Sequence, residues 1–415
     1  MEHQYHPEIP VNGNTLKAPT NQTFFPITRF HHFHKDANIN FQLNRFLISG
    51  LEDVFVEIGR HVENYVDWKK LFFAKAAAFE KEGNTDYAMG LYRAAEFFMD
   101  PADPDRKMVI ENFLRFFYQS KEEKNIEPIS VPYGNNHLHG FRLTPTIPTK
   151  GIILIHVGFD SYSEEFYTIG AAMCEYGYEV IMFDGPGQGS TLMFEKVPMT
   201  YEWEKPVAAV LDYIEAENVT LIGMSLGGYL ALRAASLEPR IKRVNAYDVM
   251  LDFFACVTSR RGKVAAYLVK GLVSIRLSFV LNAFAKLMMK KDMYSQWGIT
   301  QGMRVMGCKT PYEFFLKLKE YNGYSISGAV TADVLIMAGA EDHFVPLGQF
   351  FEQLKLLTSA RSVTGRIFTR KEQAQSHCQI GNLGVAAACM LGWIEEHSLT
   401  TQETQQNNIR QNNFK

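Results

Sequence analysis

The stretch Val219-Thr-Leu-Ile-Gly-Met-Ser225-Leu-Gly-Gly-Tyr-Leu-Ala-Leu-Arg-Ala-Ala-Ser-Leu-Glu-Pro239 decides how we interpret the whole chain. Its first six residues are mostly apolar and β-branched, which predicts a buried strand, and the Ala/Leu-rich run that follows predicts a helix ending before the proline. Ser225 lies at the bend, between Gly223 and Gly227. This Gly-x-Ser-x-Gly pattern is typical of a serine held on a sharp strand-to-helix turn, where a side chain in place of either glycine would collide with the folded-back backbone.

Such a turn would present the Ser225 hydroxyl above the edge of a sheet. The first backbone N–H groups of the helix would point at the same place, where the helix dipole is positive. A carbonyl bound there could be attacked and its oxyanion stabilised. A serine hydroxyl is a poor nucleophile at neutral pH, so this chemistry also needs a histidine base and a carboxylate that orients the histidine.

Candidates for both groups follow later strands. Asp342 lies in a turn after one predicted strand, and His377 comes after the last one, which gives the chain order Ser225, Asp342, His377. Asp248, just after another predicted strand, is our second choice for the carboxylate, and Glu341 is the third. We therefore predict Ser225 as nucleophile, His377 as base and Asp342 as the orienting acid.

Stabilising an oxyanion requires two N–H donors. The backbone N–H of Leu226, the first residue of the predicted helix, is one candidate. The other is the N–H of Phe159, in the loop after the strand that ends at His156, where Gly158 would allow a close approach.

The remaining pattern is one of strands that alternate with helices. An antiparallel hairpin is predicted from Ile129 to Leu143, and strands are predicted at 151–156, 178–184, 219–224, 241–247, 333–338 and 362–369. Alternation of this kind predicts a mostly parallel, doubly wound sheet with helices on both faces, which is an α/β fold. Ligands bind such sheets at the carboxyl ends of the strands, where every candidate above lies.

We predict five regions along the chain. They are a polar N-terminal segment (1–44), a helical N-terminal domain (45–125), a catalytic domain (126–397), a helical lid inserted into that domain at about 251–328, and a disordered polar tail (398–415). The lid carries no Asp or Glu between Phe253 and Lys291 but eight basic residues. We interpret these as solvated charges around the lid helices, with recognition of an acidic substrate or of a membrane surface as alternatives.

The composition of the chain excludes several classes of binding partner. The 415 residues are 47% hydrophobic with a net charge of −3, which gives no basic surplus for binding nucleic acid. Five widely spaced cysteines argue against a disulfide framework or a zinc site, and the chain shows neither a signal peptide nor an uninterrupted membrane span, so we expect a cytoplasmic protein. His31, His32 and His34 have no companion ligands at metal spacing, so we expect no metal and no cofactor.

The chain resembles α/β-hydrolases that carry a helical N-terminal domain, such as the acylaminoacyl-peptidase-like proteins and the dihydropseudooxynicotine hydrolases. The resemblance covers roughly residues 45–397. It depends on Gly158–Ser161, Phe183–Gly189, Gly223–Gly228, Gly339–Asp342 and Ser376–Cys378. It implies an α/β-hydrolase fold, and relatives of this kind include esterases, peptidases and carbon–carbon bond hydrolases.

We therefore expect a cofactor-independent serine hydrolase that cleaves an ester or amide bond, an acylaminoacyl peptide bond among them, through an acyl-enzyme. The alternatives are hydrolysis of a carbon–carbon bond next to a carbonyl, or a non-catalytic regulatory homologue. The expected partner is a small molecule or a short peptide. A homodimer is left open.

Overall fold

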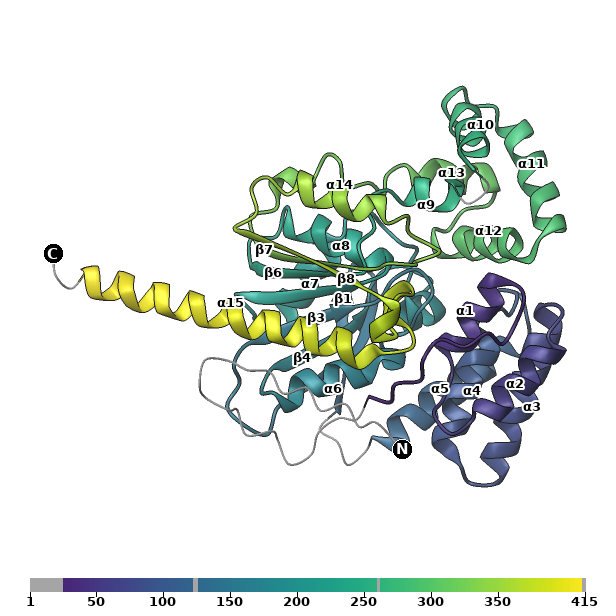
Figure 1. The fold of residues 1–415 in the computed structure, drawn as a ribbon, viewed down its shortest axis with the longest axis horizontal. Helices are drawn as coiled ribbons and strands as arrows, with labels where there is room; N and C mark the ends of the chain where they lie inside the picture. Colours follow the sequence, from purple (N-terminus) through teal and green to yellow (C-terminus); the bar gives the residue numbers. More distant parts are fainter. Residues whose placement is uncertain (1–24, 122–125, 260–261, 413–415) are drawn as a thin grey trace.

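A computed structural model describes residues 25–121, 126–259 and 262–412 (Figure 1). The first 24 residues of the predicted polar segment, Arg260 and Arg261 of the basic lid, and residues 413–415 of the predicted tail lie outside this description. One eight-stranded sheet forms the centre, in the order β1-β2-β4-β3-β5-β6-β7-β8. The strands are β1 (Ile126–Tyr133), β2 (Asn136–Leu143), β3 (Ile152–His156), β4 (Glu179–Asp184), β5 (Val219–Met224), β6 (Ile241–Tyr247), β7 (Asp333–Gly339) and β8 (Ser362–Phe368).

The sheet is mostly parallel. Strands β1 and β2 form the predicted antiparallel hairpin, β2 pairs antiparallel with β4, and the other neighbours all pair in parallel. The central strands are apolar on both sides because each side packs against helices: Leu154 belongs to the core on one face, and Ile153 and Ile155 belong to the core on the other. The predicted α/β-hydrolase arrangement is confirmed.

Two sets of helices cover the sheet (Figure 1). Helices α7 (Glu204–Tyr213), α8 (Leu226–Ala235) and α14 (Gly348–Leu356) lie on one face, and α6 (Tyr167–Glu175) and α15 (Leu383–Asn412) lie on the other. Helix α15 differs from the prediction, since it continues through Asn412 into the stretch that we expected to be a disordered tail. That stretch is polar but contains neither glycine nor proline, so nothing in it interrupts a helix that begins against the sheet.

The N-terminal helices have a core of their own, built around the buried side chains of Phe55, Trp68 and Phe72. The helices are α1 (Ala37–Arg45), α2 (Glu52–His61), α3 (Tyr65–Lys81), α4 (Thr85–Glu96) and α5 (Arg106–Ser120). Helix α1 lies inside the segment that we predicted to be merely polar. Its first turn is capped by the Asp36 side chain, and seven of its nine residues are buried.

The lid helices lie between β6 and β7 in sequence and at the same end of the sheet as the N-terminal helices (Figure 1). They are α9 (Phe253–Ser259), α10 (Lys263–Ser274), α11 (Ser278–Lys291), α12 (Met293–Val305) and α13 (Pro311–Leu318). The two groups meet at Trp297, whose ring stacks on Phe97 with 5.3 Å between centroids. Among the described residues, no helix combines the length and the apolar character needed to cross a bilayer.

Candidate active site

Ser225 is the single residue between strand β5 and helix α8. Its backbone angles, φ 59° and ψ −122°, are strained for any residue with a side chain. The turn is so tight that a Cβ on Gly223 would lie 1.9 Å from the carbonyl oxygen of Gly227. Only glycine fits at position 223, as the Gly-x-Ser-x-Gly pattern implies.

His377 reaches Ser225 from a short turn that follows β8. Its Nε2 atom lies 2.8 Å from Ser225 Oγ, and its Nδ1 atom lies 2.5 Å from Oδ2 of Asp342. The other carboxylate oxygen of Asp342 accepts hydrogen bonds from the backbone N–H groups of Phe344 and Val345 at 2.7 and 3.0 Å. These two donors fix the carboxylate, so that its second oxygen points at the imidazole.

The same contacts set the charges of the pair. Burial opposes ionisation of Asp342, but His377 and the two backbone donors outweigh it and lower the pKa of the carboxyl below its ordinary value. Burial likewise opposes protonation of His377, and the negative charge of Asp342 outweighs it and raises the pKa of the imidazole well above its ordinary value. The pair therefore favours the protonated form of the His377 imidazole.

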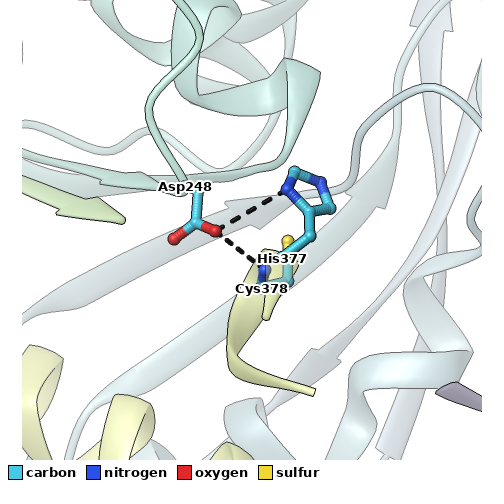
Figure 2. A group of neighbouring side chains, drawn as sticks. All are labelled: Asp248, His377 and Cys378. Carbon is cyan, nitrogen blue, oxygen red and sulfur yellow. Dashed lines mark hydrogen bonds and ion pairs between the residues drawn. The ribbon is translucent and has the colours of Figure 1, made fainter. Parts of the chain in front are cut away.

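Asp248, the second choice for the acid, lies beside His377 and Cys378 (Figure 2). Its Oδ2 atom is 3.7 Å from His377 Nδ1 and accepts the backbone N–H of Cys378 at 2.8 Å, while its Oδ1 accepts from the Gln379 amide at 2.9 Å. Burial, opposed by His377 and reinforced by the charge of Asp342, raises the pKa of Asp248 to about 7. Asp248 thus holds the backbone of the loop that carries the imidazole.

Figure 2 shows the side chains of Asp248, His377 and Cys378 as neighbours, and each has one potential ligand atom within 4.8 Å of those of the others. The cluster does not fit a metal ion. Both ring nitrogens of His377 already face Ser225 and Asp342, and both oxygens of Asp248 accept hydrogen bonds. Burial raises the pKa of the Cys378 thiol, which disfavours the thiolate that a metal needs.

Three other ionisable residues near the site, Glu341, His343 and His156, are not part of the contacts between Ser225, His377 and Asp342. Glu341 is exposed and pairs with Arg370. His343, which is next to Asp342 in the sequence, is half-buried, with its ring 3.9 Å from that of Phe344 and 4.9 Å from that of Phe41. Burial lowers the pKa of His156 to about 3, so this imidazole is neutral at physiological pH.

The loop after β3 passes directly beside the serine. A Cβ on Gly158 would lie 2.9 Å from the Cβ of Ser225 and 3.2 Å from the backbone nitrogen of Leu226. The backbone of Gly158 and Phe159 therefore runs next to the first N–H of helix α8. This placement is what two donors to one oxyanion would require.

A cavity opens above Ser225 and His377, between helix α1, the loop after β3 and the lid helices. Its wall is mainly aromatic and aliphatic. The apolar lining includes Phe41, Phe159, Phe166, Met224, Met250, Phe253, Val257, Val269, Phe284, Met288, Tyr294, Trp297, Ile299, Phe314, Phe315, Phe344 and Ile380. Such a wall suits a largely apolar ligand.

Gln42 is a polar exception in this wall. It is fully buried in helix α1, lines the cavity, and neither its amide nitrogen nor its amide oxygen has a hydrogen-bond partner among the described residues. A buried amide without partners is costly, by about 1–3 kcal/mol for each unsatisfied group. Gln42 is therefore a candidate to bind a polar group of a ligand.

Buried ion pairs tie the loop after β3 to the N-terminal helices. Arg45 binds Asp160 and Glu165, each at 2.8 Å, and Arg93 binds Glu165 at 2.7 Å and the backbone carbonyl of Asp160 at 2.6 Å. Arg93 also pairs with Glu96 at 2.7 Å. The N-terminal helices thereby fix the loop that carries Phe159.

Gln42, Arg45 and Arg93 were not among the residues predicted from the sequence. Nothing local distinguishes a glutamine that is buried beside a cavity from one on a surface. A weak signal was present for the helix itself, since Asp36 is a good N-cap residue and Ile39 and Leu43 follow it at i, i+4 spacing. The histidines at 31 and 34 lie close to this helix, where their rings contact the backbone carbonyls of Thr28 and Val62.

The amino-acid sequence is similar to those of known hydrolases. The model of the alpha/beta hydrolase family matches residues 152–364. The 20-hydroxy-prefusarin hydrolase FUS2 of Gibberella moniliformis is 31% identical over 340 residues, which cover 74% of this chain and 79% of that protein. The hydrolase acrC of Aspergillus aculeatus is 29% identical over 359 residues, with the same coverage of 74% and 79%.

Two solved structures share the fold. The 2,6-dihydroxy-pseudo-oxynicotine hydrolase superimposes with a TM-score of 0.58 at 18% identity, over 85% of this chain and 93% of that one. AbyA5 superimposes with a TM-score of 0.59 at 17% identity, over 80% of this chain and 84% of that one. Both alignments are long enough to reach beyond the residues that the family model matches.

Proposed function

The chain belongs to the alpha/beta hydrolase family, and from that membership we propose that it is a serine hydrolase whose nucleophile is Ser225. The observation that supports the proposal is the unbroken contact chain from Ser225 Oγ through both nitrogens of His377 to Asp342. Each link is within hydrogen-bond distance, so a proton can pass from the serine to the imidazole without rearrangement.

In this mechanism Ser225 Oγ forms a bond to the carbonyl carbon while its proton moves to Nε2 of His377. Asp342 stays ionised and stabilises the imidazolium. The oxyanion accepts hydrogen bonds from the backbone N–H groups of Leu226 and Phe159. His377 then gives its proton to the leaving alcohol or amine as the bond to that group breaks. Water then attacks the carbonyl carbon of the acyl-enzyme and gives a proton to His377. The bond to Ser225 Oγ breaks, His377 returns the proton to this oxygen, and the acid is released.

We propose neutral, largely apolar esters or amides as the substrate class. Apart from His377, the charged side chains that line the cavity are Arg45 and Asp160, which already pair with each other, and the rest of the described wall is mainly apolar. The unpartnered amide of Gln42 would bind one carbonyl or hydroxyl group of the substrate. A substrate of this kind fits the cavity better than a charged peptide does.

We also propose a cytoplasmic location, because the five cysteines are all free thiols, as is usual in a reducing compartment. Hydrolysis of a carbon–carbon bond beside a carbonyl is the second candidate. The same serine and histidine serve it if His377 protonates the departing carbanion, and the apolar wall suits a diketone as well as an ester.

Turnover of p-nitrophenyl esters, aminoacyl amides and diketones by the wild type and by Ser225→Ala tests the proposal. We expect ester or amide hydrolysis with an initial burst of the leaving group, and loss of both burst and turnover in the variant. Cleavage of diketones alone would favour the second candidate. Turnover that survives Ser225→Ala would refute both.

A further inference from the structure

Helices α10 and α11 form a hairpin that projects at the outer end of the lid, away from the sheet (Figure 1). Its two sides differ. Val269, Val273, Leu281 and Ala285 are buried on the inner side, where Val269 and Ala285 line the cavity. The outer side, which we call the hairpin face, carries Val264, Tyr267, Leu268, Ile275, Phe279, Val280 and Leu287.

The hairpin face is apolar yet exposed. Phe279 is 83% exposed, Val264 74% and Tyr267 73%. On α10 Val264, Tyr267 and Leu268 recur at the spacing of one helical face, and Ile275 follows as the residue that caps the helix. Exposed apolar side chains gathered on two neighbouring helices of a folded protein mark a site where something else binds.

Basic residues alternate with these apolar residues along the sequence of the hairpin. Lys270, Arg276, Lys286, Lys290 and Lys291 are all exposed. No Asp or Glu occurs between Phe253 and Lys291, and no ion pair among the described residues joins any of the five to a carboxylate. The chain as a whole has a net charge of −3, so the hairpin is a local basic region on an acidic protein.

We propose that the hairpin face binds the surface of a bilayer that contains anionic phospholipid. Exposed aromatic and aliphatic side chains enter the headgroup region, and lysines beside them attract anionic lipid, which is the composition of an interfacial membrane helix. A second copy of the chain fits less well. In a two-fold dimer the same five positive charges would face their own copies, and like charges brought together oppose association.

Membrane binding would determine where the protein resides, which is a property separate from the reaction that it catalyses. Because the inner side of α10 lines the cavity, membrane binding would bring that cavity close to the pool of apolar molecules in the bilayer. Binding to vesicles is measured without any substrate. If the protein does not bind vesicles, the proposed hydrolase activity is therefore not refuted.

Co-sedimentation of the full chain with vesicles tests the proposal, using phosphatidylcholine alone or mixed with phosphatidylserine. One variant removes apolar contacts, as Tyr267→Ser, Ile275→Ser and Phe279→Ser together. A second removes charge, as Lys286→Gln, Lys290→Gln and Lys291→Gln together. None of the six lines the cavity. Matched controls in the N-terminal region are Val66→Ser, which is also 74% exposed, and the exposed set Lys35→Gln, Lys70→Gln and Lys81→Gln.

We expect the wild type and both controls to bind the phosphatidylserine vesicles, less strongly as salt rises. The charge variant should lose about fivefold in partition coefficient for each lysine removed, roughly 100-fold in total. The apolar variant should lose binding while its hydrolysis of a water-soluble ester is unchanged. Three results would overturn the proposal: no binding by the wild type, equal losses in the controls, or a dimer in light scattering that only the hairpin variants dissociate.

Discussion

The Nδ1 atom of His377 lies 2.5 Å from Oδ2 of Asp342, and both side chains are buried. Asp248 is equally buried but lies 3.7 Å away and binds backbone and amide donors instead. The two carboxylates therefore have different tasks, although Asp248 follows β6 and Asp342 follows β7, which are neighbours in the sheet. Asp342 orients and charges the imidazole, whereas Asp248 positions the loop.

Replacement of each carboxylate by its amide separates these tasks. Asp342→Asn should lower kcat by about 10⁴-fold, because an amide no longer stabilises the imidazolium or fixes its tautomer. Asp248→Asn should cost only about tenfold, the scale of one hydrogen bond. Steady-state kinetics with one ester measures both. A larger loss for Asp248→Asn than for Asp342→Asn would reverse the assignment.

The pH dependence of kcat/KM should report His377 in the free enzyme. The imidazole must be neutral to accept a proton, so activity rises as pH increases through the pKa of His377, which Asp342 raises above its ordinary value. Asp342→Asn removes the negative charge and should shift this rise to lower pH, in the residual activity that remains. A rise that stays in place, or one that moves to higher pH, would contradict the pairing.

Gln42→Leu distinguishes substrate binding from a structural role. If the amide binds substrate, kcat/KM should fall by roughly 10- to 100-fold, the range that one lost hydrogen bond inside a cavity spans. Stability should stay level or rise, because an apolar side chain replaces a buried amide that has no partner. Urea unfolding measures the second effect. Lower stability together with unchanged kinetics would show that Gln42 holds the fold.

Glu96 should contribute to stability in a pH-dependent way. Burial opposes its ionisation, but Arg106 and Arg93 outweigh it and lower its pKa from 4.5 to about 2. A lowered pKa means that the stabilisation is complete above about pH 4.5 and is lost as pH falls toward 2. Glu96→Gln should destabilise the protein by about 3–5 kcal/mol at neutral pH, since it leaves two buried arginines less compensated.

Chemical unfolding of wild type and Glu96→Gln across this pH range tests the prediction. The difference between the two proteins should shrink as the solution becomes more acidic. Glu111→Gln is the matched control, because Glu111 pairs with Lys107 at an exposed position and should change stability by less than about 1 kcal/mol. Equal effects of the two substitutions would contradict the role given to Glu96.

The residues that carry the proposed chemistry could be found from the sequence because each follows directly on a strand. Ser225 lies between β5 and α8, and Asp342 and His377 lie in the turns after β7 and β8. In a parallel sheet the carboxyl ends of the strands lie at the same edge, whatever the length or conformation of the loops that follow them. The order of the elements therefore already implied their proximity, and the apolar strands that precede them are an easily identified pattern.

The walls of the cavity could not be found in this way. Gln42 and Arg45 come from a helix more than 100 residues away from the loop that they approach, as the contact of Arg45 with Asp160 shows. Their placement depends on how whole helices pack, and a single sequence carries no local sign of that packing. The polar tail illustrates the opposite error, since its composition predicted disorder although nothing in it interrupts helix α15.

The central claim is that Ser225 is a nucleophile activated by His377, and labelling with a fluorophosphonate probe tests it most directly. The wild type should become labelled at Ser225, as located by mass spectrometry of the digested protein. Ser225→Ala should remain unlabelled, and His377→Ala should react far more slowly. No labelling of the folded wild type, or equal labelling of Ser225→Ala, would contradict the claim.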